Sequence, residues 1–176
     1  MRKTQVTLVP LKEEDREQFI KDNQKAFKYG AAEEFGMRDD HFEEDGEIIS
    51  RDTIIESINN GEAYRIVSDG NIVGGAIVHV RQNRGDLEIL FVDPEVHSKG
   101  IGYAAWCQIE KMYPEVLVWN TLTPYFEIRN IHFYVSRCGF HIVEFFDEHH
   151  RSPLGDDSEE GSEQSLDGMF RFEKRM

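Results

Sequence analysis

Hydrophobic and polar positions along the chain change between period-two alternation, typical of strands, and spacings of three and four, typical of helices. The alternating and continuous apolar runs predict strands over Gln5–Val9, Ala63–Val67, Ile72–Val80, Asp86–Val92, Glu115–Asn120, Phe140–Phe146 and Met169–Lys174. Helical spacing predicts helices over Lys12–Tyr29, Arg51–Asn60, Tyr103–Met112 and Tyr125–Cys138. Gly30 and Gly61 are expected to end the first two helices. This order indicates a mixed sheet with helices on its faces, in the α/β class.

Two local patterns refine this outline. Asp69-Gly70 lies between two predicted strands, and it predicts a hairpin because glycine accepts the positive φ of a tight turn. The last predicted helix carries an apolar stripe, with Tyr134 at its edge. The stripe consists of Ile128, Ile131, Val135 and Cys138. We expect this stripe to pack on the sheet.

Two segments contain few apolar residues and many acids. Ala31–Glu47 is interpreted as an acidic loop or broken helix, which either attracts a cationic acceptor or is simply a solvated charge run. Residues 151–168 are interpreted as a flexible acidic loop between the last two strands. This loop could be a regulatory segment, a substrate lid or a tolerated insertion. With 176 residues, the chain 1–176 is expected to form a single domain.

Composition narrows the function classes. The net charge of -14 argues against nucleic acid and against an anionic membrane as the main partner, because both require a concentrated positive surface. An acidic surface suits a cationic amine, although it also simply keeps a protein soluble. We find no apolar stretch of signal-peptide length at the N-terminus and no run of about 18 apolar residues. The sequence therefore predicts a soluble, cytoplasmic protein, and a homodimer is left open.

The two cysteines do not suggest a metal site. Cys107 and Cys138 lack metal-type spacing, and each falls on a predicted helix among apolar neighbours. We therefore expect both to be small core residues rather than ligands or nucleophiles, and we expect no metal.

The segment from Leu87 to Tyr103 carries the strongest chemical signal, because it joins a buried strand, a short loop and a Gly-x-Gly that opens a helix. The first turn of a helix has N–H groups without intrahelical partners and a partial positive charge, so it can bind an anion. Gly100 and Gly102 allow a phosphate to approach the backbone, and Lys99 adds a mobile positive charge. The alternative interpretation is a plain glycine-rich turn into a helix.

Two well-known phosphate loops fit this segment poorly. The Walker loop has its lysine after the last glycine, whereas Lys99 precedes Gly100. The dinucleotide fingerprint G-x-G-x-x-A is satisfied by residues 100–105, but residues 93–99 separate it from the strand. In addition, Asn120 stands near the position where an acid should hold the ribose. A dinucleotide-binding protein is therefore a weak alternative.

The same segment resembles the pyrophosphate loop of the GNAT acetyltransferases, in which a strand ending in apolar-Val-x-Pro is followed by Arg/Gln-x-x-Gly-x-Gly/Ala. Four residues match this pattern, namely Val92, Pro94, Gly100 and Gly102. His97 stands where the family usually has Arg or Gln. The resemblance, which extends over Gln5–Lys174, implies a mixed, mostly antiparallel sheet of about seven strands that is splayed in the middle and has helices on both faces.

A second motif resembles the same family. Tyr134 on a predicted helix, followed by Gly139-Phe140 at the next strand, is similar to the family's Tyr and Gly-Phe pair, with one residue more than usual between Tyr134 and Gly139. The family's Asn, seven residues before the Tyr, is Glu127 here, while Asn130 lies four before. One extra residue rotates a helix face by about 100°, so the orientation of Tyr134 depends on how the helix accommodates it.

The resemblance implies acetyl-CoA as the co-substrate. Backbone groups of Phe91 and Val92 would hold the pantetheine arm, and a backbone N–H near Val92 would polarise the thioester carbonyl. The other implied cofactor-binding residues are His97, Ser98, Lys99, Gly100, Ile101, Gly102, Tyr103 and Asn130.

The implied chemistry needs a base and an acid. An alkyl amine with a pKa of about 10.4 is only roughly 0.04% neutral at pH 7, so a general base assists the attack. Glu88 is the first candidate base, and the period of the strand predicts that it shares a face with Leu90 and Val92. The alternative is that this face reaches solvent at the start of the strand and Glu88 is simply exposed. His79, which could equally be a core residue, and water alone are the other candidate bases. Tyr134 would protonate the leaving thiolate, unless it is a core aromatic residue.

Other residues have weaker functional interpretations. The acceptor pocket could be lined by Trp119, Thr121, Thr123 and Tyr125. The leading hypothesis is an N-acetyltransferase that passes an acetyl group directly, in a ternary complex, to an amine of a small molecule or peptide. The alternative is a non-catalytic acyl-CoA binding or sensing protein with the same fold.

Overall fold

The computed structural model of the protein describes residues 4–35, 47–96, 99–151 and 168–176. The strands in these ranges are β1 (Thr7–Pro10), β2 (Glu62–Ser68), β3 (Asn71–Arg81), β4 (Arg84–Val92), β5 (Val118–Pro124), β6 (His141–Phe146) and β7 (Met169–Arg175). The helices there are α1 (Arg16–Phe35), α2 (Arg51–Asn60), α3 (Ile101–Met112) and α4 (Ile128–His132). Short helical turns lie at Glu13–Asp15 and Pro94–Val96, and a π-helical turn at Phe133–Cys138 continues α4.

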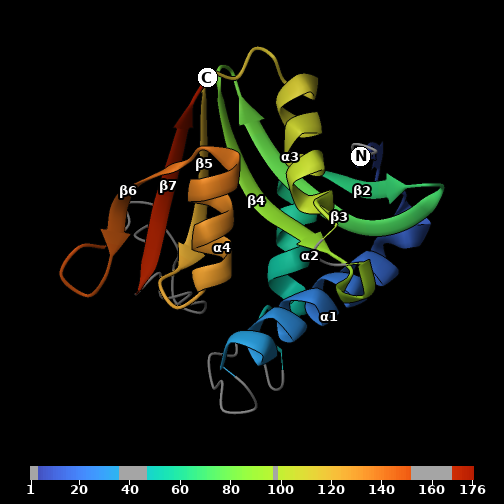
Figure 1. The fold of residues 1–176 in the computed structure, drawn as a ribbon, viewed down its shortest axis with the longest axis horizontal. Helices are drawn as coiled ribbons and strands as arrows, with labels where there is room; N and C mark the ends of the chain where they lie inside the picture. The colour runs from blue at the N-terminus through green and yellow to red at the C-terminus, as the bar shows by residue number, and fades with distance from the viewer. Residues whose placement is uncertain (1–3, 36–46, 97–98, 152–167) are drawn as a thin grey trace.

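The described strands form one seven-stranded sheet in the order β1-β2-β3-β4-β5-β7-β6. All pairs are antiparallel except β4 and β5, which are parallel. Helices α3 and α4 lie on one face of this sheet, and α1 and α2 lie on the other (Figure 1). The mixed, mostly antiparallel sheet with helices on both faces confirms the fold class predicted from the sequence.

Each face of the sheet has its own core. On the α3 and α4 face, the core includes Trp106, Trp119 and Phe140, and the indole rings of the two tryptophans meet edge to face at 5.3 Å. On the α1 and α2 face, the rings of Phe19 and Phe91 meet edge to face at 5.1 Å between centroids. Burial of large aromatic side chains on both faces fixes the helices against the sheet.

The sequence assigned a structural role to two glycines, Gly30 at the end of the first helix and Gly70 in the β2–β3 turn. The helix continues through Gly30 to Phe35, so the prediction that Gly30 ends it was wrong. An internal glycine costs only about 1 kcal/mol relative to alanine, and burial of Ala31 beyond it favours continuation. The Asp69-Gly70 hairpin is confirmed, because both residues have positive φ, at 48° and 78°.

The fifth strand begins and ends later than the sequence pattern predicted. It spans Val118–Pro124, whereas the apolar run favoured Glu115–Asn120. The backbone N–H groups of Leu117 and Val118 donate to the Asn83 carbonyl, at 2.7 and 3.3 Å, and this contact sets the start of the strand. The later end matters for the site, because it places Thr121 and Thr123 within the strand.

The π-helical turn accommodates the extra residue between Tyr134 and Gly139. A π turn holds one more residue than an α turn, and Gly139 closes it in the left-handed region with a φ of 82°. Tyr134 thereby stays buried, while Ile128 and Val135 are 69% and 39% exposed. The apolar stripe predicted for this helix was therefore wrong at these two positions. Ile128 is the first residue of α4, and Val135 lies within the π turn, which shifts the phase of the face that packs on the sheet.

None of the helices within the described ranges is both long enough and apolar enough to cross a membrane.

Candidate functional site

The parallel pair of strands separates at the centre of the sheet. Strands β4 and β5 pair only over Arg84–Asp86 and Val118–Asn120, and then diverge. Figure 1 shows the two strands starting side by side and moving apart along their length. Beyond Leu87, the edge of β4 that faces β5 therefore has backbone groups available to another partner. The expectation of a sheet splayed in the middle is confirmed.

A bulge in β4 places Glu88. Ile77 pairs with Ile89 and Val78 pairs with Leu87, so Glu88 has no partner of its own in β3. The extra residue resets the alternation, because Leu87 packs in the α3 and α4 core whereas Ile89 packs in the α1 and α2 core. The prediction that Glu88 shares a face with Leu90 and Val92 was therefore wrong.

Glu88 lies on the α1 and α2 face. Burial raises the pKa of its carboxyl group, while a hydrogen bond with Ser57 of α2 and the nearby His79 act in the opposite direction. Its side chain is 28% exposed, so it is neither a solvated surface acid nor a sealed core group. A carboxylate whose side chain is only partly exposed and whose pKa is raised is suited to act as a general base.

Tyr134 lies on the opposite face, in the core beneath α4. Its side chain packs against the rings of Phe140 and Phe172, at 5.6 and 5.7 Å between centroids. Burial raises the pKa of its hydroxyl group well above the usual value, and a hydrogen bond with Thr121 opposes this rise. The hydroxyl therefore stays protonated at neutral pH and can donate a proton.

Thr121 links this tyrosine to the point where the strands diverge. Its hydroxyl donates to the Leu87 carbonyl at 2.9 Å, just beyond the last paired residues of β4 and β5. The contacts of Thr121 therefore connect Tyr134 to the opening. Thr121 was expected to line a pocket, and this connection was missed because the predicted strand ended at Asn120, before Thr121.

The first turn of α3 forms the end of the strand–loop–helix segment. Gly100 is its N-cap residue in the left-handed region, with a φ of 75°. The Ala104 N–H donates to the Gly100 carbonyl, so the N–H groups of Ile101, Gly102 and Tyr103 precede the first intrahelical bond. These three N–H groups are the local basis of an anion site.

Positive side chains flank this turn. Lys99 is exposed, and its carbonyl accepts a 2.7 Å hydrogen bond from the Thr4 hydroxyl, which ties the loop to the N-terminal segment. The Arg137 guanidinium lies 5.7 Å from the centre of the Tyr103 ring and brings a second positive charge to the turn. The proposed contacts of His97 and Ser98 lie outside the described residues. Asn130 lies on α4 and is exposed.

The conformation of Gly100 gives a testable consequence. We expect Gly100→Ala to lower the free energy of unfolding by about 1–2 kcal/mol, because an L-residue is strained at this φ. Relaxation of the strained loop should also weaken acetyl-CoA binding by about tenfold, the equivalent of about 1.4 kcal/mol. Chemical denaturation and calorimetric titration measure the two effects.

Gly70 is the matched control for this substitution. It has a φ of 78° in the β2–β3 turn, and nothing lies within 4 Å of an added Cβ, whereas at Gly100 the Thr4 hydroxyl oxygen lies at 3.7 Å, an ordinary contact distance. Gly70→Ala should lower stability by a similar amount and leave acetyl-CoA affinity unchanged. Equal weakening of binding by both variants would contradict the role given to the α3 turn.

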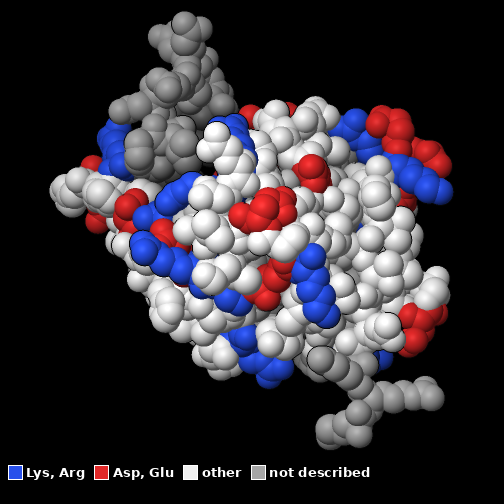
Figure 2. Space-filling view, turned by 90° about the horizontal axis from the view of Figure 1, so that it is seen from above, with Lys and Arg blue, Asp and Glu red and all other residues white. Residues whose placement is uncertain are grey.

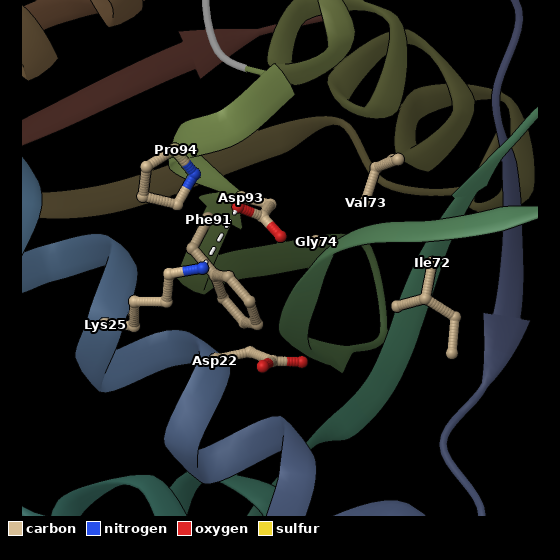
Figure 3. Close-up of a pocket in the computed structure, with 8 residues that line it drawn as sticks. All are labelled: Asp22, Lys25, Ile72, Val73, Gly74, Phe91, Asp93 and Pro94. Atoms are coloured by element: carbon tan, nitrogen blue, oxygen red, sulfur yellow. Dashed lines mark ion pairs between the residues drawn. The ribbon is translucent and has the colours of Figure 1, made fainter.

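A small cavity lies beside the end of β4 and is shown in Figure 3. Its volume is about 10 Å³, which is room for one water molecule and not for a substrate. Lys25 of α1 crosses it to form ion pairs with Asp93 at 3.5 Å and Glu95 at 3.7 Å. The cavity therefore belongs to the joint between α1 and the β4–α3 loop, and we assign it no ligand.

The residues expected to line an acceptor pocket differ in how far they are buried. Trp119 is fully buried in the core, so that expectation was wrong for Trp119. Thr123 is also buried, whereas Tyr125 is 54% exposed at the end of β5.

Cys138 is buried, which raises the pKa of its thiol to about 12, and Cys107 is half-buried. Neither cysteine has the reactive character of a nucleophile.

Charge is mixed on the face of the molecule shown in Figure 2. Lys and Arg side chains are interspersed there with Asp and Glu side chains. The net negative charge of the chain therefore does not appear on this face as one continuous acidic patch. The acidic segments singled out in the sequence fall largely in residues 36–46 and 152–167, which lie outside the described residues.

Comparison with known proteins places the chain among acetyltransferases. Solved structures that share its fold include two with coenzyme A or acetyl-CoA bound. The PaiA N-acetyltransferase from Thermoplasma acidophilum, in complex with coenzyme A, has a TM-score of 0.66 at 17% identity, with 97% of this chain and 99% of that chain covered. A GNAT family acetyltransferase from Elizabethkingia anophelis with acetyl-CoA bound has a TM-score of 0.57 at 14% identity, with 72% and 84% covered.

Sequence comparison is more specific. The chain is 45% identical to the uncharacterized protein YrkN of Bacillus subtilis (strain 168), with 97% of this chain and 94% of that protein covered. The model of the acetyltransferase (GNAT) family matches residues 16–140, which include β4, the loop after it, α3 and Tyr134. Acetyl-CoA as the co-substrate agrees with this match. The diverging β4 and β5, the left-handed Gly100 and these matches together show that the chain belongs to the GNAT acetyltransferase family.

Proposed function

We propose that the protein transfers the acetyl group of acetyl-CoA directly to an amine of a small molecule or peptide, in a ternary complex. The observation that carries this proposal is the placement of Glu88 and Tyr134 on opposite faces of the sheet, where β4 and β5 separate. A thioester in the opening would have a base on the side from which an amine approaches. It would have an acid on the side to which sulfur leaves.

The opening and the α3 turn suit the parts of acetyl-CoA. The β4 edge at Phe91 and Val92 offers backbone groups to the amide groups of the pantetheine arm. The N–H groups of Ile101, Gly102 and Tyr103 suit the pyrophosphate. We include His97, Ser98 and Lys99 of the loop and Asn130 of α4 in the proposed binding set.

The reaction balances with these groups alone. The amine nitrogen attacks the thioester carbon, and its proton passes to Glu88 directly or through water. The carbonyl oxygen gains negative charge, which a backbone N–H near Val92 stabilises. The C–S bond then breaks, and the thiolate takes a proton from Tyr134. The proton held by Glu88 returns through water to the Tyr134 phenolate, which restores both groups for the next turnover. The products are the acetylated amine and coenzyme A.

Steady-state and mass-spectrometric experiments test direct transfer. The protein is incubated with acetyl-CoA and a panel of aliphatic diamines and peptides with free N-termini, and release of coenzyme A is followed with a thiol reagent. We expect amine-dependent release and intersecting initial-rate patterns. An acetylated protein, detected by mass spectrometry after incubation with acetyl-CoA alone, would contradict direct transfer.

The alternative, an acyl-CoA binding or sensing protein without turnover, makes a different prediction. It requires acetyl-CoA binding in calorimetry but no amine-dependent release of coenzyme A. The placement of Glu88 and Tyr134 on opposite faces of the sheet, where β4 and β5 separate, favours turnover, because a binding protein needs neither a base nor an acid there.

A further inference from the structure

His79 lies beside Glu88 on the same face of the sheet. It pairs with Asp86 in the β3–β4 ladder, and its Nδ1 lies 3.8 Å from Oε1 of Glu88. Both side chains are partly buried, at 24% and 28% exposed, so water screens their interaction only in part. The bulge brings them together, because Glu88 is the extra residue between two paired positions of β4.

Arg81 fixes the tautomer of this histidine. Its Nε donates to Nε2 of His79 at 3.2 Å. An arginine Nε always carries a proton, so Nε2 of His79 must accept and carries none. The imidazole proton is therefore on Nδ1, the nitrogen that faces Glu88.

We propose that His79 is a positioning residue that directs its Nδ1–H at the Glu88 carboxylate, with its tautomer set by Arg81. This inference rests on the proposed function, because it assigns His79 a task at the base of that reaction. With its proton on Nδ1 and with Nε2 accepting from Arg81, His79 has no lone pair free to take a proton from an amine. It therefore supports Glu88 rather than replacing it as the base.

The surroundings of Glu88 show why such support matters. Burial raises the pKa of Glu88, and the carboxylates of Asp86 on β4 and Glu56 on α2 raise it further. The Ser57 hydroxyl of α2 lowers it, and the positive end of the Nδ1–H dipole of His79 on β3 acts in the same direction. Without His79, only Ser57 opposes the effects of burial, Asp86 and Glu56 on the pKa of Glu88. The pKa should therefore rise, and the Glu88 carboxyl group should ionise only at higher pH.

Nuclear magnetic resonance tests the tautomer without any assay of activity. Long-range ¹H–¹⁵N spectra of the full chain should show His79 protonated on Nδ1 at neutral pH, and Arg81→Met should move population to the Nε2 form. A ¹³C titration of the glutamate carboxyls should show Glu88 titrating at higher pH in His79→Phe. The Nε2 tautomer in the wild type, or an unchanged Glu88 titration, would overturn the proposal.

Kinetics separates a positioning role from a catalytic one. In His79→Phe, kcat/KM should fall by about three- to tenfold at pH 6 and stay within about twofold at pH 9, because one unit of pKa changes the ionised fraction tenfold. His79→Gln, whose amide can still donate, should recover part of the loss at pH 6. Loss of activity at all pH values in a folded His79→Phe would instead make His79 the base.

The two proposals fail separately. If Glu88→Gln keeps full activity, Glu88 is not the base and the proposed mechanism fails, while the spectra still report whether His79 directs its proton at Glu88. If the spectra show no coupling but Glu88→Gln is inactive, the proposed function stands and the role of His79 falls.

Discussion

Replacement of Tyr134 by phenylalanine should lower kcat by about 100-fold or more, with acetyl-CoA affinity nearly unchanged. Proton donation by a positioned side chain contributes about 10²–10⁴ to the rate of such reactions, and Tyr134→Phe removes only the hydroxyl group. The ring contacts with Phe140 and Phe172 remain, so the core should keep its packing. Single-turnover rates and calorimetric titration with acetyl-CoA measure the two quantities.

Tyr113 provides the matched control. It is also a hydrogen-bonded tyrosine whose pKa is raised by burial, with Glu62 and Tyr64 as its partners. It lies at the C-terminal end of α3, about 18 Å along the helix from the turn at Gly100. Tyr113→Phe should reduce stability and leave kcat within about threefold. Similar losses of kcat in both variants would show that Tyr134 acts through stability alone.

Replacement of Glu88 by glutamine should lower kcat/KM at neutral pH by about 100-fold or more. The wild-type value should rise with pH through the raised pKa of Glu88, because the base works only when ionised. The glutamine variant should lack this transition. Its rate should recover as the pH approaches the pKa of the amine, where the substrate loses its proton without help. A full pH profile of kcat/KM for both proteins measures this difference.

Asp86→Asn is the control for the charge of Glu88. Asp86 is a second carboxylate of β4 on the same face, two positions earlier, and burial raises its pKa as well. If Glu88 acted only through the electric field of its negative charge, removal of the charge of Asp86 or of Glu88 would lower kcat/KM by a similar factor. We expect Asp86→Asn to retain kcat/KM within about threefold and to keep the pH transition. A loss equal to that of Glu88→Gln would contradict the role of a specific base.

Most of the fold could be predicted because local patterns agree with it. The alternation in β2 and β3, the Asp69-Gly70 turn and the strand–loop–glycine segment each depend on residues close together in the chain. Helix α1 was predicted too short for a related reason. A glycine has a local cost that packing elsewhere can offset, and the sequence does not reveal the packing.

The catalytic geometry was harder to predict because two insertions control it. The bulge at Glu88 and the π turn around Tyr134 each add one residue to a regular element. A periodic pattern assumes that no such residue exists, so it placed Glu88 on the wrong face and left the orientation of Tyr134 open. The unusual spacing between Tyr134 and Gly139 was the one signal in the sequence of such an irregularity.

The partners of the candidate catalytic residues come from distant parts of the chain. Thr121 reaches Leu87 across 34 positions, and Ser57 of α2 reaches Glu88 of β4. Neither pairing has a local signature, because each depends on which strands and helices become neighbours.

The most direct test of the central claim is a crystal structure of the protein with acetyl-CoA. We expect the pyrophosphate to accept hydrogen bonds from the N–H groups of Ile101, Gly102 and Tyr103. We expect the thioester to lie in the opening between β4 and β5, with Tyr134 on one side and Glu88 on the other. Acetyl-CoA bound elsewhere, or an empty opening at saturating acetyl-CoA, would contradict the account.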